Sequence, residues 1–279
     1  MNHLHRELAP ISEAAWEEIS AEATRDLRHY LSGRRVVDLS GPHGWDHSCL
    51  DLGRVTDPAE GPADGVESRV RLVQPLTELR TPFRVSREEI DAVDRGAPDA
   101  DWEPVVDAAR RAALAEDRLV FNGSPVAGVR GIVEASPHEA VTITTDYSTY
   151  PTAVATAVER LKRAGVEGPY ALALGPRCYT GVIETTEHGG YPVLEHLRLI
   201  TGGPVVWAPA VDGAVVVSLR GGDFELVVGQ DFSIGYLTHD AESVTLYLEE
   251  SVTFRPISPE AAIGLTYADT LKGSRRKRS

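Results

Sequence analysis

Two histidines, His43 and His47, have the four-residue spacing with which a helix presents a pair of metal ligands. Gly41, Pro42 and Gly44 surround the first of them, and these residue types argue against a helix there. No glutamate follows His43, as the zinc-protease pattern on a helix would require. We therefore predict that both histidines lie in a polar loop and do not form a metal site.

A thiol and a base are available in Cys178 and His188. The residues around Cys178 match no nucleophile signature, and a lone cysteine commonly serves as a small apolar side chain in a core. The glycine-rich segment 123–131 contains Gly128 and Gly131, but it lacks both the G-x-G-x-x-G spacing and the Lys-Ser/Thr pair of phosphate-binding loops. Its glycines are therefore assigned to tight turns.

Paired carboxylates are the third possible source of chemistry. Glu17 with Glu18, and Glu249 with Glu250, are adjacent in the sequence, so the members of each pair point in different directions. This arrangement suits solvated faces better than an acid and a base acting on one bond. We therefore predict no catalytic residue and no metal or cofactor ligand, and a structural role is favoured.

The charge of the chain argues against nucleic acid and membrane partners. Its 279 residues are 42% apolar, which is enough for a sizeable core, and the net charge is −14. Such a balance repels phosphate backbones and anionic lipid, and the basic segment 272–278 is interpreted as a solvated tail. Only Cys49 and Cys178 are present, which fits a reducing cytoplasm. We find neither an export signal nor an apolar run of about 20 residues.

The spacing of apolar residues predicts the elements that position these side chains. An amphipathic helix is expected over 12–31, with Gly33 as its stop. Two short β-like stretches then flank an acidic tip at 57–65, which predicts a long hairpin that projects from the body. In its second stretch Val70 and Leu72 alternate with arginines, and they need a surface to pack against.

The rest of the chain mixes helices and strands. Further helices are expected over 103–119, from Pro151 to Gly165 and after Pro192. Strands are expected at 170–174, 214–219, 224–228 and 244–249. Residues 136–222 are predicted to form a compact α/β unit, and the chain as a whole belongs to the α+β class.

Several short segments, in order along nearly the whole chain, match the pattern of one family. They include Leu8-Ala9-Pro10-Ile11, Gly33-Arg34-Arg35-Val36-Val37-Asp38, Gly41-Pro42-His43-Gly44-Trp45, Gly165-Val166-Glu167-Gly168-Pro169-Tyr170, Gly221-Gly222-Asp223-Phe224 and Gly229-Gln230-Asp231-Phe232-Ser233-Ile234-Gly235-Tyr236. So many matches in order would be hard to produce by chance. The chain resembles the encapsulin family, also known from linocin-type bacteriocin descriptions.

The resemblance implies the major capsid fold of tailed phages, the Hong Kong 97 type, with a peripheral domain, an extended loop and an axial domain. We expect 1–45 to hold the N-terminal helix and the start of the peripheral domain, 46–77 the extended loop, 78–135 the spine helix of the peripheral domain, 136–222 the axial domain, 223–270 returning peripheral strands and 271–279 a basic disordered tail.

The function implied by the resemblance is structural. Members of the family are not enzymes themselves, but assemble into closed icosahedral cages that take up cargo enzymes through a C-terminal targeting peptide. The resemblance thus implies a homo-oligomer, a T=1 60-mer, that works as a cytoplasmic nanocompartment. The implied cargo is a dye-decolourising peroxidase or a ferritin-like iron protein.

Two sets of residues carry over from the family. The loop at the five-fold pore matches Thr186, Glu187, His188, Gly189, Gly190 and Tyr191. The site for the cargo peptide matches Leu27, Tyr30, Leu31, Arg34, Asp38 and Ile234. A helix face would also bury Leu27, Tyr30 and Leu31 as ordinary core residues, so both interpretations of these three residues stay open.

One position departs from the family. Some encapsulins hold a flavin against a tryptophan, and this chain has Glu88 at that place. An acidic side chain offers no stacking face, so we predict no tightly bound flavin. The alternatives to a cargo shell are a phage or prophage capsid protein that packages DNA and a peptidase or hydrolase. The acidic charge argues against the first, and no residue constellation supports the second.

Overall fold

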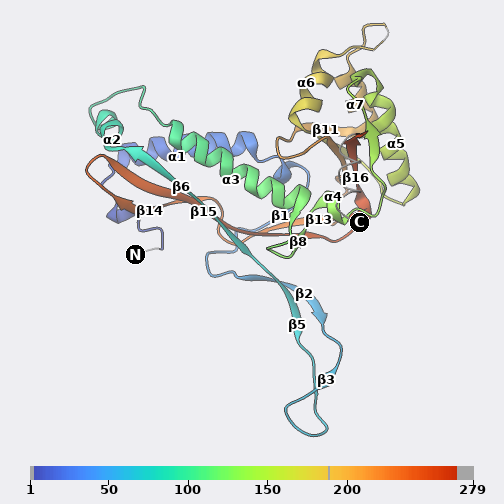
Figure 1. The fold of residues 1–279 in the computed structure, drawn as a ribbon, viewed down its shortest axis with the longest axis horizontal. Helices are drawn as coiled ribbons and strands as arrows, with labels where there is room; N and C mark the ends of the chain where they lie inside the picture. Colours follow the sequence, from blue (N-terminus) through green and yellow to red (C-terminus); the bar gives the residue numbers. More distant parts are fainter. Residues whose placement is uncertain (1–2, 188, 269–279) are drawn as a thin grey trace.

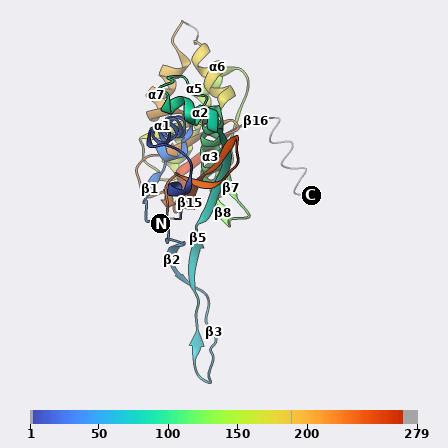
Figure 2. The ribbon, with the colours of Figure 1, turned by 90° about the vertical axis from the view of Figure 1, so that its left-hand side faces the viewer.

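Two five-stranded sheets with helices packed on them, and a long hairpin that leaves the body, make up the molecule (Figure 1). The computed structural model describes residues 3–187 and 189–268. The two sheets lie side by side, and the hairpin extends well below both when the molecule is turned by 90° (Figure 2). No helix in these ranges is long and apolar enough to span a bilayer.

The first sheet is organised around one long strand. Its members are β1 (Asp38–Ser40), β13 (Phe224–Val228), β15 (Ser243–Pro256), β14 (Ser233–His239) and β6 (Thr77–Ser86). Strand β15 pairs antiparallel with β13 and β14 along one edge and with β6 along the other. Its residues Val244, Leu246 and Leu248 alternate along one face and are buried, as the period of a strand requires.

Helices α1 (Glu13–Tyr30), α2 (Arg87–Asp94) and α3 (Glu103–Asn122) pack on this sheet. The Ser12 hydroxyl accepts a hydrogen bond from Ala15 N at 3.2 Å and so caps α1. Gly123 ends α3 with φ +79°, a conformation that glycine adopts without strain. The predicted helices over 12–31 and 103–119 are therefore confirmed, and the second is slightly longer than expected.

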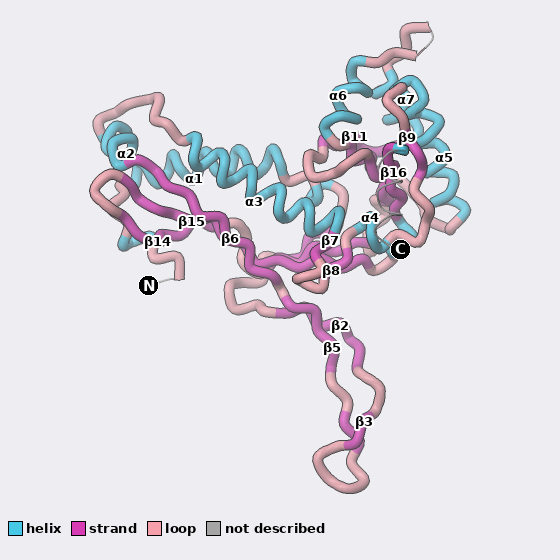
Figure 3. The backbone as a smooth tube through the Cα atoms, in the orientation of Figure 1, coloured by secondary structure: helices cyan, strands magenta, loops and turns pink. Residues whose placement is uncertain are grey.

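The second sheet has the order β11 (Gly202–Trp207), β10 (Tyr170–Leu174), β12 (Ala214–Ser218), β16 (Ala262–Tyr267) and β9 (Val141–Ile143). Helices α4 (Ile132–Ala135), α5 (Tyr150–Arg163), α6 (Pro176–Glu184) and α7 (Val193–Thr201) accompany it. All residues of β10 and β12 are buried, as expected of central strands covered on both faces. Figure 3 shows helices around this sheet.

Strand β16 corrects one expected boundary. The range 223–270 was assigned to returning peripheral strands, but β16 pairs with β12 and β9 in the second sheet. Its first four residues, Ala262–Leu265, are fully buried and form a continuous small and apolar run. Such a run suits a strand that is covered on both faces, which the centre of the second sheet provides. The range 223–270 is therefore divided between the two sheets.

The predicted hairpin is confirmed. Its arms are β2 (Cys49–Val55) and β5 (Arg71–Pro75), and β3 (Ala59–Glu60) pairs with β4 (Glu67–Ser68) near the tip. A second, small hairpin is formed by β7 (Gly123–Ser124) and β8 (Val129–Arg130), as the turns expected in 123–131 imply. Short 3-10 turns occur at Arg6–Leu8, Gly33–Arg35, Tyr147–Thr149 and Pro259–Ala261.

Candidate functional site

A groove lies between α1 and the edge strand β14, with a cavity of about 210 Å³. We call it the α1/β14 groove, and its lining residues are Leu4, Arg6, Ser20, Ala23, Thr24, Leu27, Phe232, Ser233, Ile234 and Leu248. The helix contributes residues four apart, Ala23 and Leu27, because that spacing keeps side chains on one face. Strand β14 contributes Ser233 and Ile234, and Phe232 directly precedes the strand on the same side as Ile234, two positions away.

The structure brings two of the six expected cargo-peptide residues to this groove. Leu27 is 9% exposed and Ile234 is 5% exposed, and they face each other across the cavity from elements that are about 200 positions apart in the chain. Leu31 is buried in the same apolar cluster but does not line the groove.

The other three expected residues do not form a rim around the α1/β14 groove. The Tyr30 ring lies 5.4 Å from the Trp207 ring and 5.5 Å from the Arg110 guanidinium, between α1, α3 and β11. Asp38 accepts a hydrogen bond from Gly222 N at 2.6 Å and so joins β1 to the turn before β13. Arg34 is directed into a cluster of carboxylates.

Arg34, Glu116, Asp231 and Glu250 form a connected set that we call the Arg34 cluster. The Arg34 Nη2 atom lies 2.6 Å from Glu116 Oε2, 2.6 Å from Glu250 Oε1 and 2.8 Å from Asp231 Oδ1. Glu116 and Glu250 are fully buried, and Asp231 is partly exposed. The cluster ties the end of α1 to α3 and β15, so it stabilises the fold around the groove.

The electrostatics of the Arg34 cluster follow from one cation among three carboxyl groups. Burial lowers the pKa of Arg34, but its hydrogen bonds to Glu116 and Asp231 and the charge of Glu250 outweigh this and raise it. Burial raises the pKa of Glu250 well above its ordinary value, and repulsion from Glu116 adds to the increase. Glu250 therefore holds its proton more tightly than a solvated carboxyl group does.

The expectation that Glu249 and Glu250 lie on solvated faces is wrong. Glu249 is 2% exposed and Glu250 is fully buried. The two side chains do point in different directions: Glu250 meets Arg34, while Glu249 Oε2 accepts a hydrogen bond from Arg80 Nε at 2.7 Å. Each buried charge has an arginine partner, which is what permits its burial.

Another buried carboxylate, Asp117, holds the turn that follows α1. Its oxygens accept hydrogen bonds from Ser32 N at 3.0 Å, from Ser32 Oγ at 2.5 Å and from Gly33 N at 2.8 Å. Burial raises the pKa of Asp117 to about 6, although these hydrogen bonds favour the ionised form. The turn that positions Arg34 is therefore tied directly to α3.

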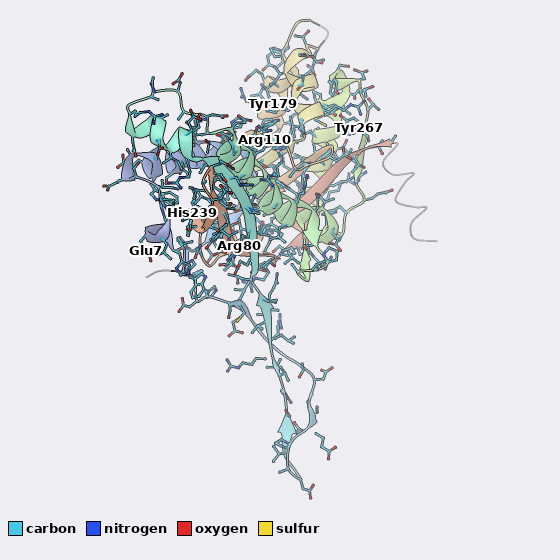
Figure 4. All side chains as sticks on the ribbon, turned by 60° about the vertical axis from the view of Figure 1, so that its left-hand side comes forward. Glu7, Arg80, Arg110, Tyr179, His239 and Tyr267 are labelled. Atoms are coloured by element: carbon cyan, nitrogen blue, oxygen red, sulfur yellow. The ribbon has the colours of Figure 1, made fainter. Side chains whose placement is uncertain are left out.

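The hairpin presents apolar side chains to solvent. Val70 is 64% exposed and Leu72 is 40% exposed, and three other valines of the hairpin are similar. Figure 4 shows the side chains of both arms standing away from the body, below the labelled Arg80. In the part of the chain that the structure describes, no surface covers these side chains, although their alternation predicts one.

The loop expected at the five-fold pore connects α6 to α7. It lies beyond the second sheet, at the end of the molecule away from the long hairpin (Figure 1). Thr186 and Pro192 form an isolated antiparallel bridge, and Glu187 N donates a hydrogen bond to Tyr191 O at 2.8 Å. The Glu187 carboxylate also lies 2.9 Å from His196 Nδ1. Gly189 and Gly190 have positive φ angles, and His188 lies outside the described residues.

The residues considered for catalysis or metal binding, Cys178, His43 and His47, have surroundings typical of core and loop residues. Cys178 is fully buried, and its Sγ lies 3.1 Å from the hydroxyl groups of both Tyr150 and Tyr267. Burial raises the pKa of both tyrosines. His43 and His47 lie in the loop between β1 and β2, as predicted. Among the described residues, no group of three or more His, Cys, Asp or Glu side chains is placed to hold a metal ion.

Eight of the ten residues that line the groove were not among the six expected for the cargo site. Phe232 and Leu248 belong to alternating apolar stretches, so the period of β14 and β15 could have indicated them. Leu4 and Arg6 precede the first predicted helix and carry no periodic signal. Only the folded chain brings them beside β14.

Comparison with known proteins identifies the fold and the family. A family model described as "Encapsulating protein for peroxidase" matches residues 1–253. The type 1 encapsulin shell protein of Rhodospirillum rubrum is 52% identical and covers 97% of this chain and 99% of its own length. The protein of the same name in Mycobacterium tuberculosis is 46% identical, with 96% of this chain and 100% of its own length covered.

Solved structures show the same fold at low identity. The virus-like particle from Pyrococcus furiosus gives a TM-score of 0.65 at 18% identity, covering 89% of this chain and 98% of its own. The capsid of Myoviridae phage XM1 gives 0.54 at 11% identity, covering 85% and 92%. The chain has the phage capsid fold, as expected, and it belongs to the type 1 encapsulin shell protein family.

Proposed function

We propose that this chain is the shell subunit of a closed homo-oligomeric cage, and that the hairpin is its main assembly device. The observation that carries the proposal is the row of exposed apolar side chains on the hairpin, namely Val55, Val66, Val70, Leu72 and Val73. A two-stranded ribbon is marginally stable in water by itself. A neighbouring subunit that covers these side chains would stabilise the ribbon and join the two subunits.

The projecting shape of the hairpin suits subunit contacts that close into a particle. A projecting arm that docks on a different surface of the next subunit is a heterologous contact, and such contacts build rings or shells when they close. We propose a T=1 60-mer as the closed form. Sedimentation and negative-stain images of the purified protein test this, and a stable 30.2 kDa monomer would contradict it.

The second part of the proposal is that the α1/β14 groove receives the targeting peptide of a cargo protein. The groove has an aliphatic floor in Leu27, Ile234 and Leu248, and it runs beside the edge of a sheet. Both features suit an extended peptide, since the edge offers backbone partners and the floor offers pockets for alternate side chains. A peroxidase or a ferritin-like iron protein is the proposed cargo, and a cytoplasmic nanocompartment is the proposed setting, supported by the free Cys49 and Cys178.

We propose that the shell contributes no catalysis and holds no flavin. Glu88 lies beside a cavity of about 630 Å³ whose lining is mostly charged. The described lining residues are Ser86, Arg87, Glu88, Asp91, Arg95, Ala241 and Glu242. An isoalloxazine ring would find no aromatic face among them. The loop 186–191 is proposed to line the opening through which small molecules pass.

The cargo proposal is tested with Leu27→Asp and Ile234→Asp. Each places an unpaired carboxylate where an aliphatic anchor would dock, so capture of a fluorescent protein with the C-terminal peptide of a copurifying cargo should fall by at least about tenfold. Leu199→Asp is the control, because Leu199 is 72% exposed and lies on α7 beside the second sheet, outside the groove. Co-sedimentation after co-expression is the measurement. Intact shells of both groove variants that load like the control would place the peptide site elsewhere.

A further inference from the structure

The chain's own N-terminal residues lie across the α1/β14 groove. Leu4 is 9% exposed and lines the cavity, and its carbonyl oxygen accepts a hydrogen bond from Tyr236 N at 2.8 Å. Strand β14 pairs with β15 along one edge, and no strand in the described part of the chain pairs with its other edge. Leu4 therefore occupies both a backbone position at an open sheet edge and an apolar position above the floor.

Polar and aromatic contacts hold this segment. The His3 carbonyl oxygen accepts a long hydrogen bond from the Tyr247 hydroxyl at 3.4 Å, and His3 Nε2 lies 3.8 Å from Glu249 Oε1. The Arg6 guanidinium stacks 4.1 Å from the Trp16 ring, and its Nη2 lies 3.4 Å from Ser20 Oγ. The His3 ring stacks at 4.4 Å on Trp45, which is 60% exposed. Such contacts are individually weak when solvent reaches them.

The backbone between Leu4 and Arg6 is strained. His5 has φ +50° and ψ +29°, the left-handed region that residues with a Cβ adopt at a cost. Its side chain is exposed, so packing of His5 itself does not compensate for this cost. At His5 the segment turns away from β14, after the backbone hydrogen bond between Leu4 and Tyr236, whereas an extended peptide could continue along the edge.

We infer that residues His3–Arg6 form a strap that competes with the cargo peptide for the edge of β14 and for the α1/β14 groove. This inference rests on the proposed cargo site and names its regulation. A cargo peptide would place an aliphatic side chain where Leu4 lies, and one of its carbonyl groups would accept the hydrogen bond from Tyr236 N. The apparent affinity for the peptide is then reduced by the fraction of subunits whose strap is closed.

Opposite substitutions at one exposed position test the strap. His5→Val disfavours the left-handed conformation and should open the strap, so the cargo peptide should bind about fivefold more tightly. His5→Gly removes the strain and should close the strap, so the peptide should bind about fivefold more weakly. Apparent affinities come from reassembling guanidinium-dissociated shells with increasing labelled cargo peptide and counting bound peptide per shell.

A second measurement uses the strap as its own probe. A labelled octapeptide with the sequence of residues 1–8 should bind shells that lack residues 2–5 at least about tenfold more tightly than full-length shells. The same peptide carrying Leu4→Asp should not bind, and unlabelled cargo peptide should displace the parent octapeptide.

The outcomes separate the strap from the cargo site. If Leu27→Asp and Ile234→Asp abolish cargo capture while both His5 variants bind the peptide like wild type, the groove stands and the strap is overturned. Weaker cargo binding after deletion of residues 2–5 also overturns the strap, because it would show that the segment is a wall of the site. Capture that is insensitive to the groove variants overturns the proposed site itself.

Discussion

The hairpin and the Arg34 cluster place their side chains in opposite environments. The hairpin exposes Val70 and Leu72 to water, whereas the cluster buries Glu116 and Glu250 in the interior. Both placements are unfavourable unless a partner is supplied. In the cluster the partner is Arg34 of the same chain, while for the hairpin no covering surface is found within the described residues.

The difference indicates that folding and assembly are separable in this subunit. The buried carboxyl groups Glu116, Glu249 and Glu250 have arginine partners within the same chain, so they do not need a neighbouring subunit to provide a cation. We propose that the hairpin gains its packing from a second copy. Substitutions in the two regions should therefore fail in different ways, one by loss of particles and the other by loss of stability.

The largest effect is expected for the double variant Val70→Asp with Leu72→Asp. Two carboxylates would have to enter the proposed subunit contact unpaired, so particles should be absent while the folded body persists. Analytical ultracentrifugation and circular dichroism measure the two properties. Val126→Asp is the matched control, because Val126 is fully exposed in the small hairpin between β7 and β8. Normal particles from the double variant would remove the hairpin from the assembly mechanism.

Arg34→Ala should produce the largest loss of stability. It leaves the buried carboxyl groups of Glu116 and Glu250 without their cation, a type of change that costs about 3–5 kcal/mol. Guanidinium unfolding at fixed protein concentration measures it. Arg25→Ala removes an exposed pair with Glu22 on α1 and should cost no more than about 1 kcal/mol. Equal losses for the two variants would contradict the role of the Arg34 cluster.

Asp117→Asn should cost less, about 1–3 kcal/mol of unfolding free energy. The amide can accept hydrogen bonds through one oxygen only, so its nitrogen would face a donor from Ser32 or Gly33. Guanidinium unfolding provides the value, and hydrogen exchange at Gly33 N reports whether the turn after α1 has loosened. Unchanged exchange together with unchanged stability would show that the turn is held by other contacts.

The smallest effect is a change in pH dependence. The pKa of Glu250 is raised in the folded chain above its ordinary value of 4.5. Protonated Glu250 therefore contributes its full stabilisation below about pH 4.5, and this contribution is lost as the pH rises through the pKa of the folded state. The wild-type protein should therefore lose stability relative to Glu250→Gln as pH rises from 4.5. Asp117 is present in both proteins, so its own titration cancels in the difference. A constant difference between pH 4 and pH 8 would contradict the raised pKa.

Local sequence signals predicted most of the elements correctly. The helix over 12–31, the strand at 170–174 and the hairpin around 57–65 all appear in the structure. These elements follow from capping residues, turn residues and the period of apolar side chains, which depend on neighbours only a few positions away. The short helices α2 and α6 were not predicted, although α7, which is as short as α6, was.

The candidate site was predicted only in part. Leu27 and Ile234 meet in the α1/β14 groove. The apolar period of the first helix indicated that Leu27 would face inward, whereas Ile234 was expected only from the family resemblance. Arg34 and Asp38 follow the same helix in sequence, yet one enters a buried cluster and the other binds a turn before β13. Proximity in the sequence to a groove residue did not place them at the groove.

The sequence by itself determined the family, the long helices and the presence of a projecting hairpin, because these depend on local spacing and on ordered motifs. The tertiary structure alone decided that Glu250 is buried, that β16 joins the second sheet and that Leu4 covers the groove. Arg34 and Glu250 are in contact although they are 216 positions apart in the chain. Leu4 and Tyr236 are also in contact and far apart in the chain. Whether such residues meet depends on how the sheets and helices pack, which the spacing of residues within one element does not encode.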